Sequence, residues 1–193
     1  MTTEIGRVVR LQVQTGSLKR GERPHRVYDP RALAEAPLLR MSPRGAAGEV
    51  DGEIILDVHH VDHPASKSEP GREASFGFTS HYAKMRETYG EHLATGCAGE
   101  NILVESERVW LLEDLADGLA FQSRDSGAIL GLSRVSVADP CVEFSRFALA
   151  DVEAAPHELK PVLQFLGAGT RGYVFTPTGD FTLRAGDLLV KLS

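Results

Sequence analysis

Cys141 is one of only two cysteines in the sequence, and it directly follows an Asp-Pro pair. The apolar stretch 128–137 (AILGLSRVSV) predicts a buried strand, and Pro140 cannot donate to a strand ladder, so the chain should leave the sheet there. A thiol on a loop at a strand end is held by a rigid scaffold. Its thiolate could be a nucleophile, a metal ligand or a persulfide carrier, favoured by Arg146 and opposed by Asp139. Inert packing of a small apolar side chain is the alternative.

A histidine cluster, HHVDH, brings His59, His60 and His63 together with Asp57 and Asp62. His59 and His63 have the four-residue spacing of some helical zinc sites, but the residues before them are strand-like. A strand would place His59 and His60 on opposite faces. No Glu occupies the general-base position of an HExxH motif, and both cysteines are far away along the chain. We therefore favour surface or hydrogen-bonding histidines over a metal site.

Two glycine-rich segments could bind an anion. In TGCAGENILVE, Gly99 precedes Glu100 and Asn101 at the entry to a predicted strand, where the N–H groups of a tight turn can cradle negative charge. A helix-to-strand connector tied by Asn101 is the alternative. In GAGTRGYVF, Arg171 sits between small residues, so its guanidinium is free to pair with a phosphate or a carboxylate. With Cys141, these segments offer a soft ligand, a backbone cradle and an anion clamp.

Most of the periodicity around these residues is typical of β-strands. Strands are predicted at 5–13, 53–59, 101–104, 108–112, 128–137, 171–176 and 187–192. Few of the connections are long or periodic enough to be crossover helices, which favours a mainly antiparallel, closed or curled sheet. The predicted fold class is mainly β with a few helices (α+β).

Helices are fewer. The stretch 81–94 (HYAKMRETYGEHLA) repeats apolar residues at three- and four-residue steps, and Ser80 can cap its start. A shorter helix is predicted over 161–166, with its proline in the first turn, and a helical turn near 31–36. The stretch 63–72 (HPASKSEPGR) predicts one long loop, a feature that is often functional in a compact domain.

Composition narrows the function classes. The 193 residues fit one domain, and the 42% hydrophobic and 25% charged content is typical of a soluble globular protein. The net charge of −6 disfavours binding to nucleic acid or to an anionic membrane, so an anionic ligand must be held locally. The sequence shows no secretory signal, no apolar run long enough for a membrane span and no disulfide framework. These features predict a cytoplasmic protein with free thiols.

The order of the motifs resembles the MOSC domain, named for the C-terminal domain of molybdenum cofactor sulfurase. The resemblance is carried by GENI at 99–102, Pro-Cys at 140–141 with Phe144, GTRGY at 169–173 and GD at 186–187. The stretches 48–60 and 72–82 also lie where stand-alone bacterial-type members carry a glycine, acid and histidine segment and a helix. The resemblance covers about 45–193, and weakly the first strand, within an expected single domain over 1–193.

This resemblance implies a closed β-barrel like the pyruvate-kinase barrel domain, and binding of the molybdenum cofactor (molybdopterin). It implies that Cys141 ligates molybdenum or carries sulfur as a persulfide. The groups expected around the pterin and its phosphate are Gly99, Glu100, Asn101, Arg171, Arg72, Lys67 and His81. Many members have Arg where this sequence has Asp139. The aminotransferase-like domain of full sulfurases is missing, so pyridoxal phosphate is not expected on this chain.

Two functions remain open within the resemblance. One is a molybdenum-dependent oxidoreductase that reduces N-hydroxylated compounds, with electrons from a separate flavin or iron–sulfur protein, since two cysteines cannot hold such a cluster. The other is a sulfur carrier supplied by a sulfur-donor protein. Outside the resemblance, Cys141 could be a hydrolase nucleophile paired with a histidine, or the protein could be a non-catalytic β-barrel binding module. The sequence predicts neither a substrate nor an oligomeric state.

Overall fold

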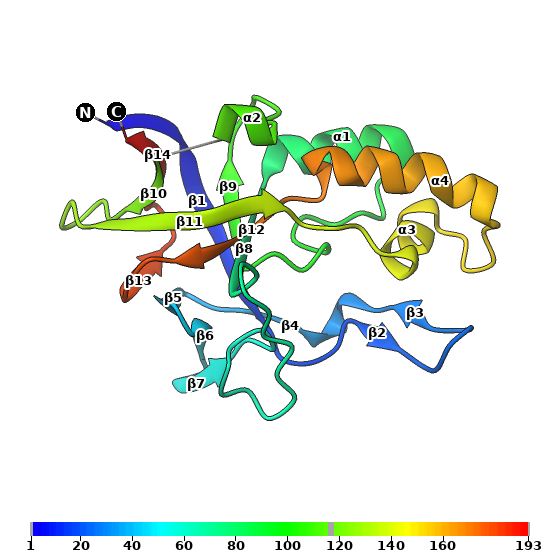
Figure 1. The fold of residues 1–193 in the computed structure, drawn as a ribbon, viewed down its shortest axis with the longest axis horizontal. Helices are drawn as coiled ribbons and strands as arrows, with labels where there is room; N and C mark the ends of the chain where they lie inside the picture. The colour runs from blue at the N-terminus through cyan, green and yellow to red at the C-terminus, as the bar shows by residue number, and fades with distance from the viewer. Residues whose placement is uncertain (1, 116–117, 193) are drawn as a thin grey trace.

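The computed structural model describes residues 2–115 and 118–192, and seven of its strands close into a barrel (Figure 1). In order around the barrel they are β1 (Thr2–Gln14), β14 (Leu188–Leu192), β10 (Leu119–Gln122), β11 (Ile129–Val137), β12 (Tyr173–Pro177), β8 (Ala74–Phe78) and β9 (Ile102–Glu105). β9 pairs back with β1 to close the ring, and neighbours are antiparallel except β8 and β9. The predicted fold class, a mainly β protein with a closed barrel, is therefore confirmed.

A smaller sheet and a short ribbon lie beside the barrel, in the lower half of Figure 1. The sheet has the order β13 (Phe181–Arg184), β5 (Leu38–Ser42), β6 (Gly45–Val50) and β7 (Glu53–Leu56). The ribbon consists of β2 (Lys19–Arg20) and β3 (Val27–Tyr28), and β4 (Leu33–Glu35) pairs with the end of β1. The sequence did not predict β5 and β6, because both segments are short and β6 is rich in glycine and alanine, which are depleted in strands.

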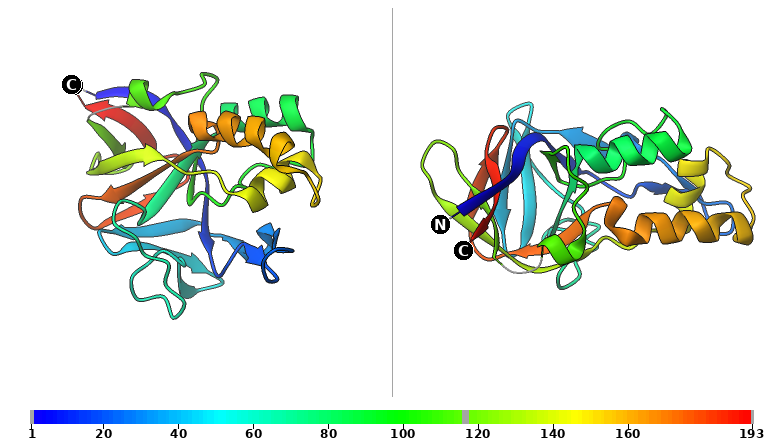
Figure 2. Two further views of the ribbon diagram at one scale, coloured as in Figure 1. Left: turned by 45° about the vertical axis from the view of Figure 1, so that its right-hand side comes forward. Right: turned by 90° about the horizontal axis from the view of Figure 1, so that it is seen from above.

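Three helices pack together on one side of the barrel (Figure 2). They are α1 (Thr79–Tyr89), α3 (Val142–Leu149) and α4 (Pro156–Phe165); α4 continues into an irregular turn over Leu166–Thr170. A fourth helix, α2 (Leu112–Leu115), is a single turn, and a 3₁₀ turn covers Pro30–Ala32. Within residues 2–115 and 118–192, no helix is long and apolar enough to cross a membrane.

Several predicted elements differ from the observed ones. The segment before α2 is not a strand, because side chains from elsewhere use its backbone carbonyls: Ser80 donates to the carbonyl of Arg108 and Tyr173 to that of Trp110. α1 begins at Thr79 with no side-chain cap, so Ser80 is not its N-cap. α4 begins at Pro156 rather than at the later proline, because Pro156 fits the first turn.

Two further predictions about the region around Cys141 need correction. β11 is not a buried strand: of its nine residues only Leu130 is buried, since its outer face meets solvent. The helix α3, which starts directly after Cys141, was not predicted. The loop predicted over 63–72 is confirmed, since it contains neither strand nor helix.

Aromatic side chains fill the barrel. Phe76 on β8 is fully buried, and its ring lies 5.3–6.4 Å from the ring centres of Phe121, Tyr173 and Phe175, which come from two other strands. Such tilted and edge-on pairs add to the free energy gained by burial. One aromatic cluster therefore holds β8, β10 and β12 together inside the barrel.

We expect the substitution Phe76→Ala to lower the free energy of unfolding by about 3–5 kcal/mol, because it leaves a cavity that the surrounding strands cannot close. Urea denaturation measures the change. Ile129→Ala, at a position 44% exposed on the same barrel, should cost less than about 1 kcal/mol. Equal losses in the two variants would contradict a core centred on Phe76.

Candidate functional site

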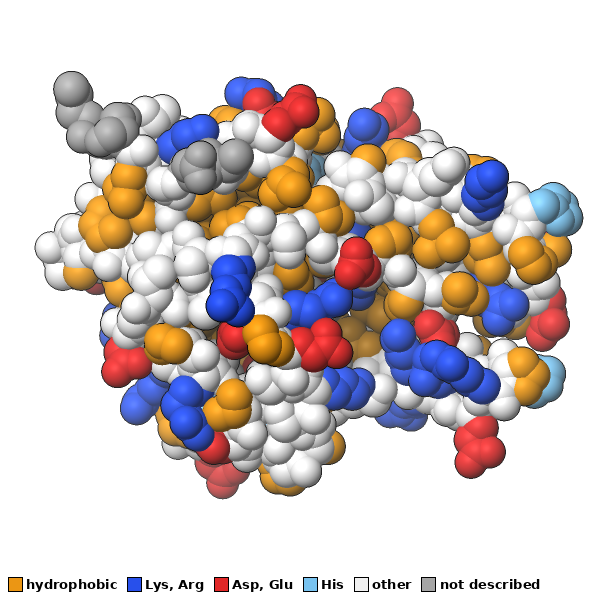
Figure 3. All heavy atoms as spheres, viewed as in Figure 1, with side chains coloured by type: hydrophobic (Ala, Val, Ile, Leu, Met, Phe, Trp, Pro, Cys, Tyr) orange, Lys and Arg blue, Asp and Glu red, His pale blue; other side chains and the backbone are white. Residues whose placement is uncertain are grey.

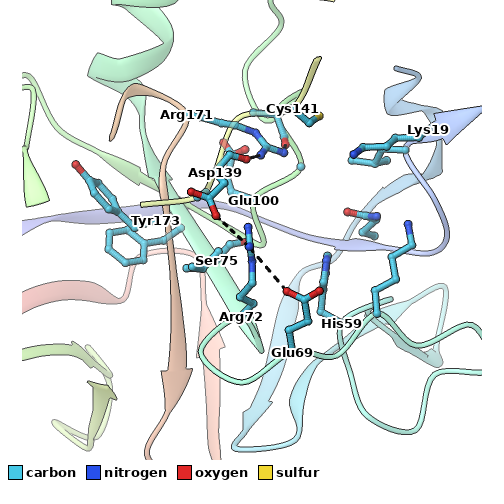
Figure 4. Close-up of a pocket in the computed structure, with 18 of the residues that line it drawn as sticks. Lys19, His59, Glu69, Arg72, Ser75, Glu100, Asp139, Cys141, Arg171 and Tyr173 are labelled. Carbon is cyan, nitrogen blue, oxygen red and sulfur yellow. Dashed lines mark hydrogen bonds and ion pairs between the residues drawn. The ribbon is translucent and has the colours of Figure 1, made fainter. Parts of the chain in front are cut away.

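A cavity of about 310 Å³ lies beside β8 and β12, and the segments just before β9 and β12 and just after β11 also line it (Figure 4). The β2–β3 ribbon and the loop after β7 complete its walls. The polar and ionisable side chains lining it are those of Gln14, Lys19, Tyr28, His59, Lys67, Glu69, Arg72, Ser75, Glu100, Asp139, Cys141, Arg171 and Tyr173. In Figure 3, Lys and Arg side chains gather around a hollow near the middle of the face shown.

Cys141 lies on the cavity wall as the N-cap of α3. Its Sγ accepts a hydrogen bond from the backbone N–H of Phe144 at 3.5 Å, and its side chain is partly exposed. The positive end of the helix dipole favours negative charge on this sulfur. Cys97, in contrast, is buried away from the cavity, and burial raises its pKa to about 12. Cys141 is thus the thiol that a ligand in this cavity can reach.

Arg171 faces the cavity but is not free, as the sequence suggested. Its guanidinium donates to the carbonyl oxygens of Asp139 and Ala98 and lies 5.3 Å from the ring centre of Phe144. Its Nε is buried and has no hydrogen-bond partner in the described part of the chain. These contacts fix the orientation of the Arg171 guanidinium. Its Nε–H group can still donate a hydrogen bond.

Lys19 and Lys67 add positive charge from the β2–β3 ribbon and the long loop. Lys67 donates to Oγ of Ser17 at 3.1 Å. Burial lowers its pKa, and the charges of Lys19 and Arg26 lower it further. Glu143 pairs with both of these neighbours. Lys19 and Arg26 share this one carboxylate, and Lys67 adds a third positive charge close to them, so positive charge is left for an anion.

Arg72 also lines the cavity, and two carboxylates compete for it. Its Nη1 lies 3.2 Å from Asp139 and 3.9 Å from Glu69 (dashed in Figure 4). Asp139, which precedes the Pro-Cys pair, thus forms an ion pair with Arg72, a side chain that could otherwise contact a bound anion.

Glu100 forms part of the cavity floor. One carboxyl oxygen accepts from the hydroxyl of Tyr82 at 2.9 Å, and the other, Oε1, is buried with no hydrogen-bond partner in residues 2–115 and 118–192. Burial raises the pKa of Glu100 to about 7, against the opposing effects of the Tyr82 hydrogen bond and the charge of Arg171. The floor therefore carries a carboxyl group that binds or releases a proton near neutral pH.

The remaining residues of the Gly-Glu-Asn turn have structural roles. Gly99 has a φ of +91°, and an added Cβ would lie 2.6 Å from a methyl group of Leu18. Asn101 is buried below the cavity: its amide donates to Asp57 at 2.8 Å, and its oxygen accepts from the backbone N–H of Ser75 at 3.0 Å. Asn101 thus ties the turn, which is the alternative that the sequence left open.

The structure separates the histidines. His81 does not line the cavity; its ring lies against Phe78, Nε2 is 3.1 Å from the carbonyl of Trp110, and burial lowers its pKa to about 4. His60 and His63 hold local turns, and only His59 of that cluster reaches the cavity. No group of three or more potential metal-ligating His, Cys, Asp or Glu residues occurs in the described residues.

Of the residues expected at the site, the structure brings together Cys141, Gly99, Glu100, Arg171, Arg72 and Lys67. Sequence reasoning missed Lys19, Tyr28, Glu69 and Ser75 as lining residues, and it left the role of His59 open. The Lys-Arg pair after the long first strand was a usable signal for Lys19. Nothing local to Tyr28 or Ser75 distinguished them, because folding alone brings them to the cavity.

No family model matches the sequence, and neither does any curated protein. Solved structures that share its fold include the three that follow. The YuaD protein from Bacillus subtilis matches with a TM-score of 0.56 and 15% identity, over 100% of this chain and 98% of that one. YiiM from Escherichia coli matches with a TM-score of 0.51 and 13% identity, over 83% and 65%. YiiM from Geobacillus stearothermophilus gives 0.51 and 16%, over 100% and 76%. At these identities the likeness concerns the fold alone, a closed β-barrel with a few helices.

Replacement of Glu100 by Gln should remove a pH dependence of stability. Because the folded pKa of about 7 exceeds the ordinary value of 4.5, the folded protein binds more protons than the unfolded chain between these values. This contribution to stability is complete below about pH 4 and is lost as the pH rises to about 7, a change of about 3 kcal/mol.

Urea unfolding at about pH 4 and about pH 8 tests this expectation. The free energy of unfolding of the wild type should fall by up to about 3 kcal/mol more than that of Glu100→Gln. The variant keeps an acceptor for Tyr82, so the comparison isolates the ionisation. Parallel pH profiles would show that Glu100 ionises normally.

Proposed function

We propose that this protein binds the molybdenum cofactor, with Cys141 as the molybdenum ligand or the bearer of a persulfide. The observation that supports the proposal is that one cavity brings the accessible thiol of Cys141 together with four cationic side chains, Lys19, Lys67, Arg72 and Arg171. The cofactor combines a soft metal centre with a phosphate. A thiolate suits the first, and Lys and Arg suit the second.

The residues present fit such a group. A cavity of about 310 Å³ lies at the lower end of the range for small-molecule sites, roughly 300–1,000 Å³. The buried Nε of Arg171 has donor capacity to offer, and the turn at Gly99 has no room for a side chain. Lys19 and Lys67 would hold the anionic end, and Cys141 the metal end. When bound, the cofactor supplies a metal centre that can exchange electrons.

Two versions of this function stay equally open. As an oxidoreductase, the protein would reduce N-hydroxylated compounds with electrons from a separate donor protein. As a sulfur carrier, it would accept sulfur on Cys141 from a donor protein and pass it on; the partial exposure of the thiol suits both. Either role needs Cys141 reduced between turnovers, so a reducing compartment such as the cytoplasm is part of the proposal.

The test is reconstitution with molybdenum cofactor, followed by measurement of bound molybdenum. The wild type should retain the metal after gel filtration, whereas Cys141→Ser should lose at least about tenfold in affinity, because loss of a ligand costs no less than loss of its supporting contacts. Cys97→Ala, which removes the buried thiol, is the matched control and should bind as the wild type does. Equal, negligible metal in the wild type and Cys141→Ser would refute the proposal.

Two assays then separate the versions. Turnover of an N-hydroxylated base with a supplied electron donor identifies a reductase. A cyanide-labile sulfur on Cys141 identifies a carrier.

The charge at Asp139 gives a second prediction. Asp139→Asn should tighten molybdopterin binding about two- to fivefold, because it releases Arg72 from a partly exposed ion pair of this strength. Titration calorimetry at low salt measures the change, and the gain should shrink as salt is added. Asp125→Asn, which removes an exposed charge from the turn before β11, should leave the affinity unchanged. Weaker binding by Asp139→Asn would show that the carboxylate aids binding.

A further inference from the structure

Asp57 and His59 form a hydrogen-bonded pair on the cavity wall that cofactor binding leaves unexplained. Nδ1 of His59 lies 2.9 Å from Oδ1 of Asp57. The Asp57 side chain is 0% exposed, whereas that of His59 is 34% exposed and lines the cavity. One partner of the pair is thus fixed in the interior, and the other meets any bound ligand.

The surroundings of Asp57 determine which nitrogen of His59 carries the proton. Oδ2 of Asp57 accepts from the backbone N–H of Gln14 at 2.7 Å and from the amide of Asn101 at 2.8 Å. Oδ1 accepts from the backbone N–H of His59 at 2.9 Å. Burial opposes the charge of Asp57, but these hydrogen bonds and the one from the His59 ring lower its pKa, so it is ionised. An ionised carboxylate only accepts, so Nδ1 of His59 must donate.

Nε2 of His59 then holds the lone pair of the neutral ring. This atom has no hydrogen-bond partner in the described part of the chain. Figure 4 shows the ring beside Glu69 and Arg72, directed into the space that Cys141 and Arg171 also face. A proton acceptor is therefore presented to the cavity and oriented from behind by a buried carboxylate.

The two neighbouring histidines show that this arrangement is specific to His59. Nδ1 of His60 accepts from the backbone N–H of Asp62 at 3.1 Å, and Nδ1 of His63 accepts from that of Ala65 at 3.0 Å. Their neutral rings therefore carry the proton on Nε2. These rings hold turns, whereas the His59 ring is set in the opposite tautomer.

We propose that His59 is the proton-transfer residue of this cavity, and that Asp57 is its positioning residue. Nε2 takes a proton from solvent, and Asp57 stabilises the resulting imidazolium. Nε2 then donates this proton to a heteroatom of the bound ligand, whose lone pair forms the new bond to hydrogen.

The substrate of this step rests on the reductase version of the proposed function. An N-hydroxylated base takes up two electrons from the donor protein and two protons; its N–O bond breaks, and an amine N–H and a water molecule form. The imidazolium of His59 supplies one of these protons to the departing oxygen, and solvent water supplies the other to the nitrogen. His59 is then neutral again and is recharged from solvent through its exposed edge.

The first test needs no cofactor. Long-range ¹H–¹⁵N correlation spectra of the protein at about pH 8.5, where imidazoles are neutral, report the tautomer of each histidine. We expect the proton on Nδ1 in His59 and on Nε2 in His60 and His63, and we expect Asp57→Asn to lose the Nδ1 preference of His59. A proton on Nε2 of His59 in the wild type would overturn the proposal.

The second test uses the cofactor-loaded protein. His59→Gln should keep the molybdenum content of the wild type but lose roughly 10²–10⁴-fold in turnover of an N-hydroxylated base. His60→Gln is the matched control and should keep turnover within about twofold. Normal turnover in His59→Gln would remove the proton-transfer role. If the wild type itself binds no molybdenum, the proposed cofactor binding is refuted independently of this inference. The NMR tautomer of His59 then decides whether Asp57 positions that ring as proposed.

Discussion

The buried carboxylate of Asp57 is the interaction on which the cavity depends. It joins the end of β1 through Gln14, the start of β9 through Asn101, and the loop after β7 to which it belongs. A buried charge without partners costs several kcal/mol, so the N–H groups of these three segments are held in hydrogen bonds to the Asp57 carboxylate. The small sheet and the barrel are thereby fixed to each other beneath the ligand site. Asn101 extends the connection to Ser75, the second residue of β8.

The cavity also gathers positive charge on a protein that is acidic as a whole. The net charge is −6, yet the cavity receives cations from separate segments: the β2–β3 ribbon, the long loop and the start of β12. Each is held by a local contact, as Lys67 is by Ser17 and Arg171 by the ring of Phe144. Positive potential is thus confined to one concave surface, where low-dielectric walls strengthen it.

The sequence predicted the barrel and the parts of the site that local motifs mark. Pro140 ends the strand before Cys141, and a glycine is required at position 99, so both features were readable from residue type. Lys19 and Tyr28 reach the cavity only through the folding of the β2–β3 ribbon, which no local pattern encodes. His81 follows β8 closely in sequence, but its face of α1 turns toward Trp110. α3 was missed because its N-cap is a cysteine, outside the usual set of Ser, Thr, Asp and Asn.

The sulfur of Cys141 faces the cavity and is also the acceptor that caps the start of α3. Any atom bonded to this sulfur changes how strongly it accepts from the N–H of Phe144, and so changes the first turn of α3. That turn also carries Glu143, the carboxylate that holds Lys19 and Arg26 of the neighbouring ribbon. The chemical state of one sulfur atom is therefore coupled to the ion pairs that hold the β2–β3 ribbon against α3.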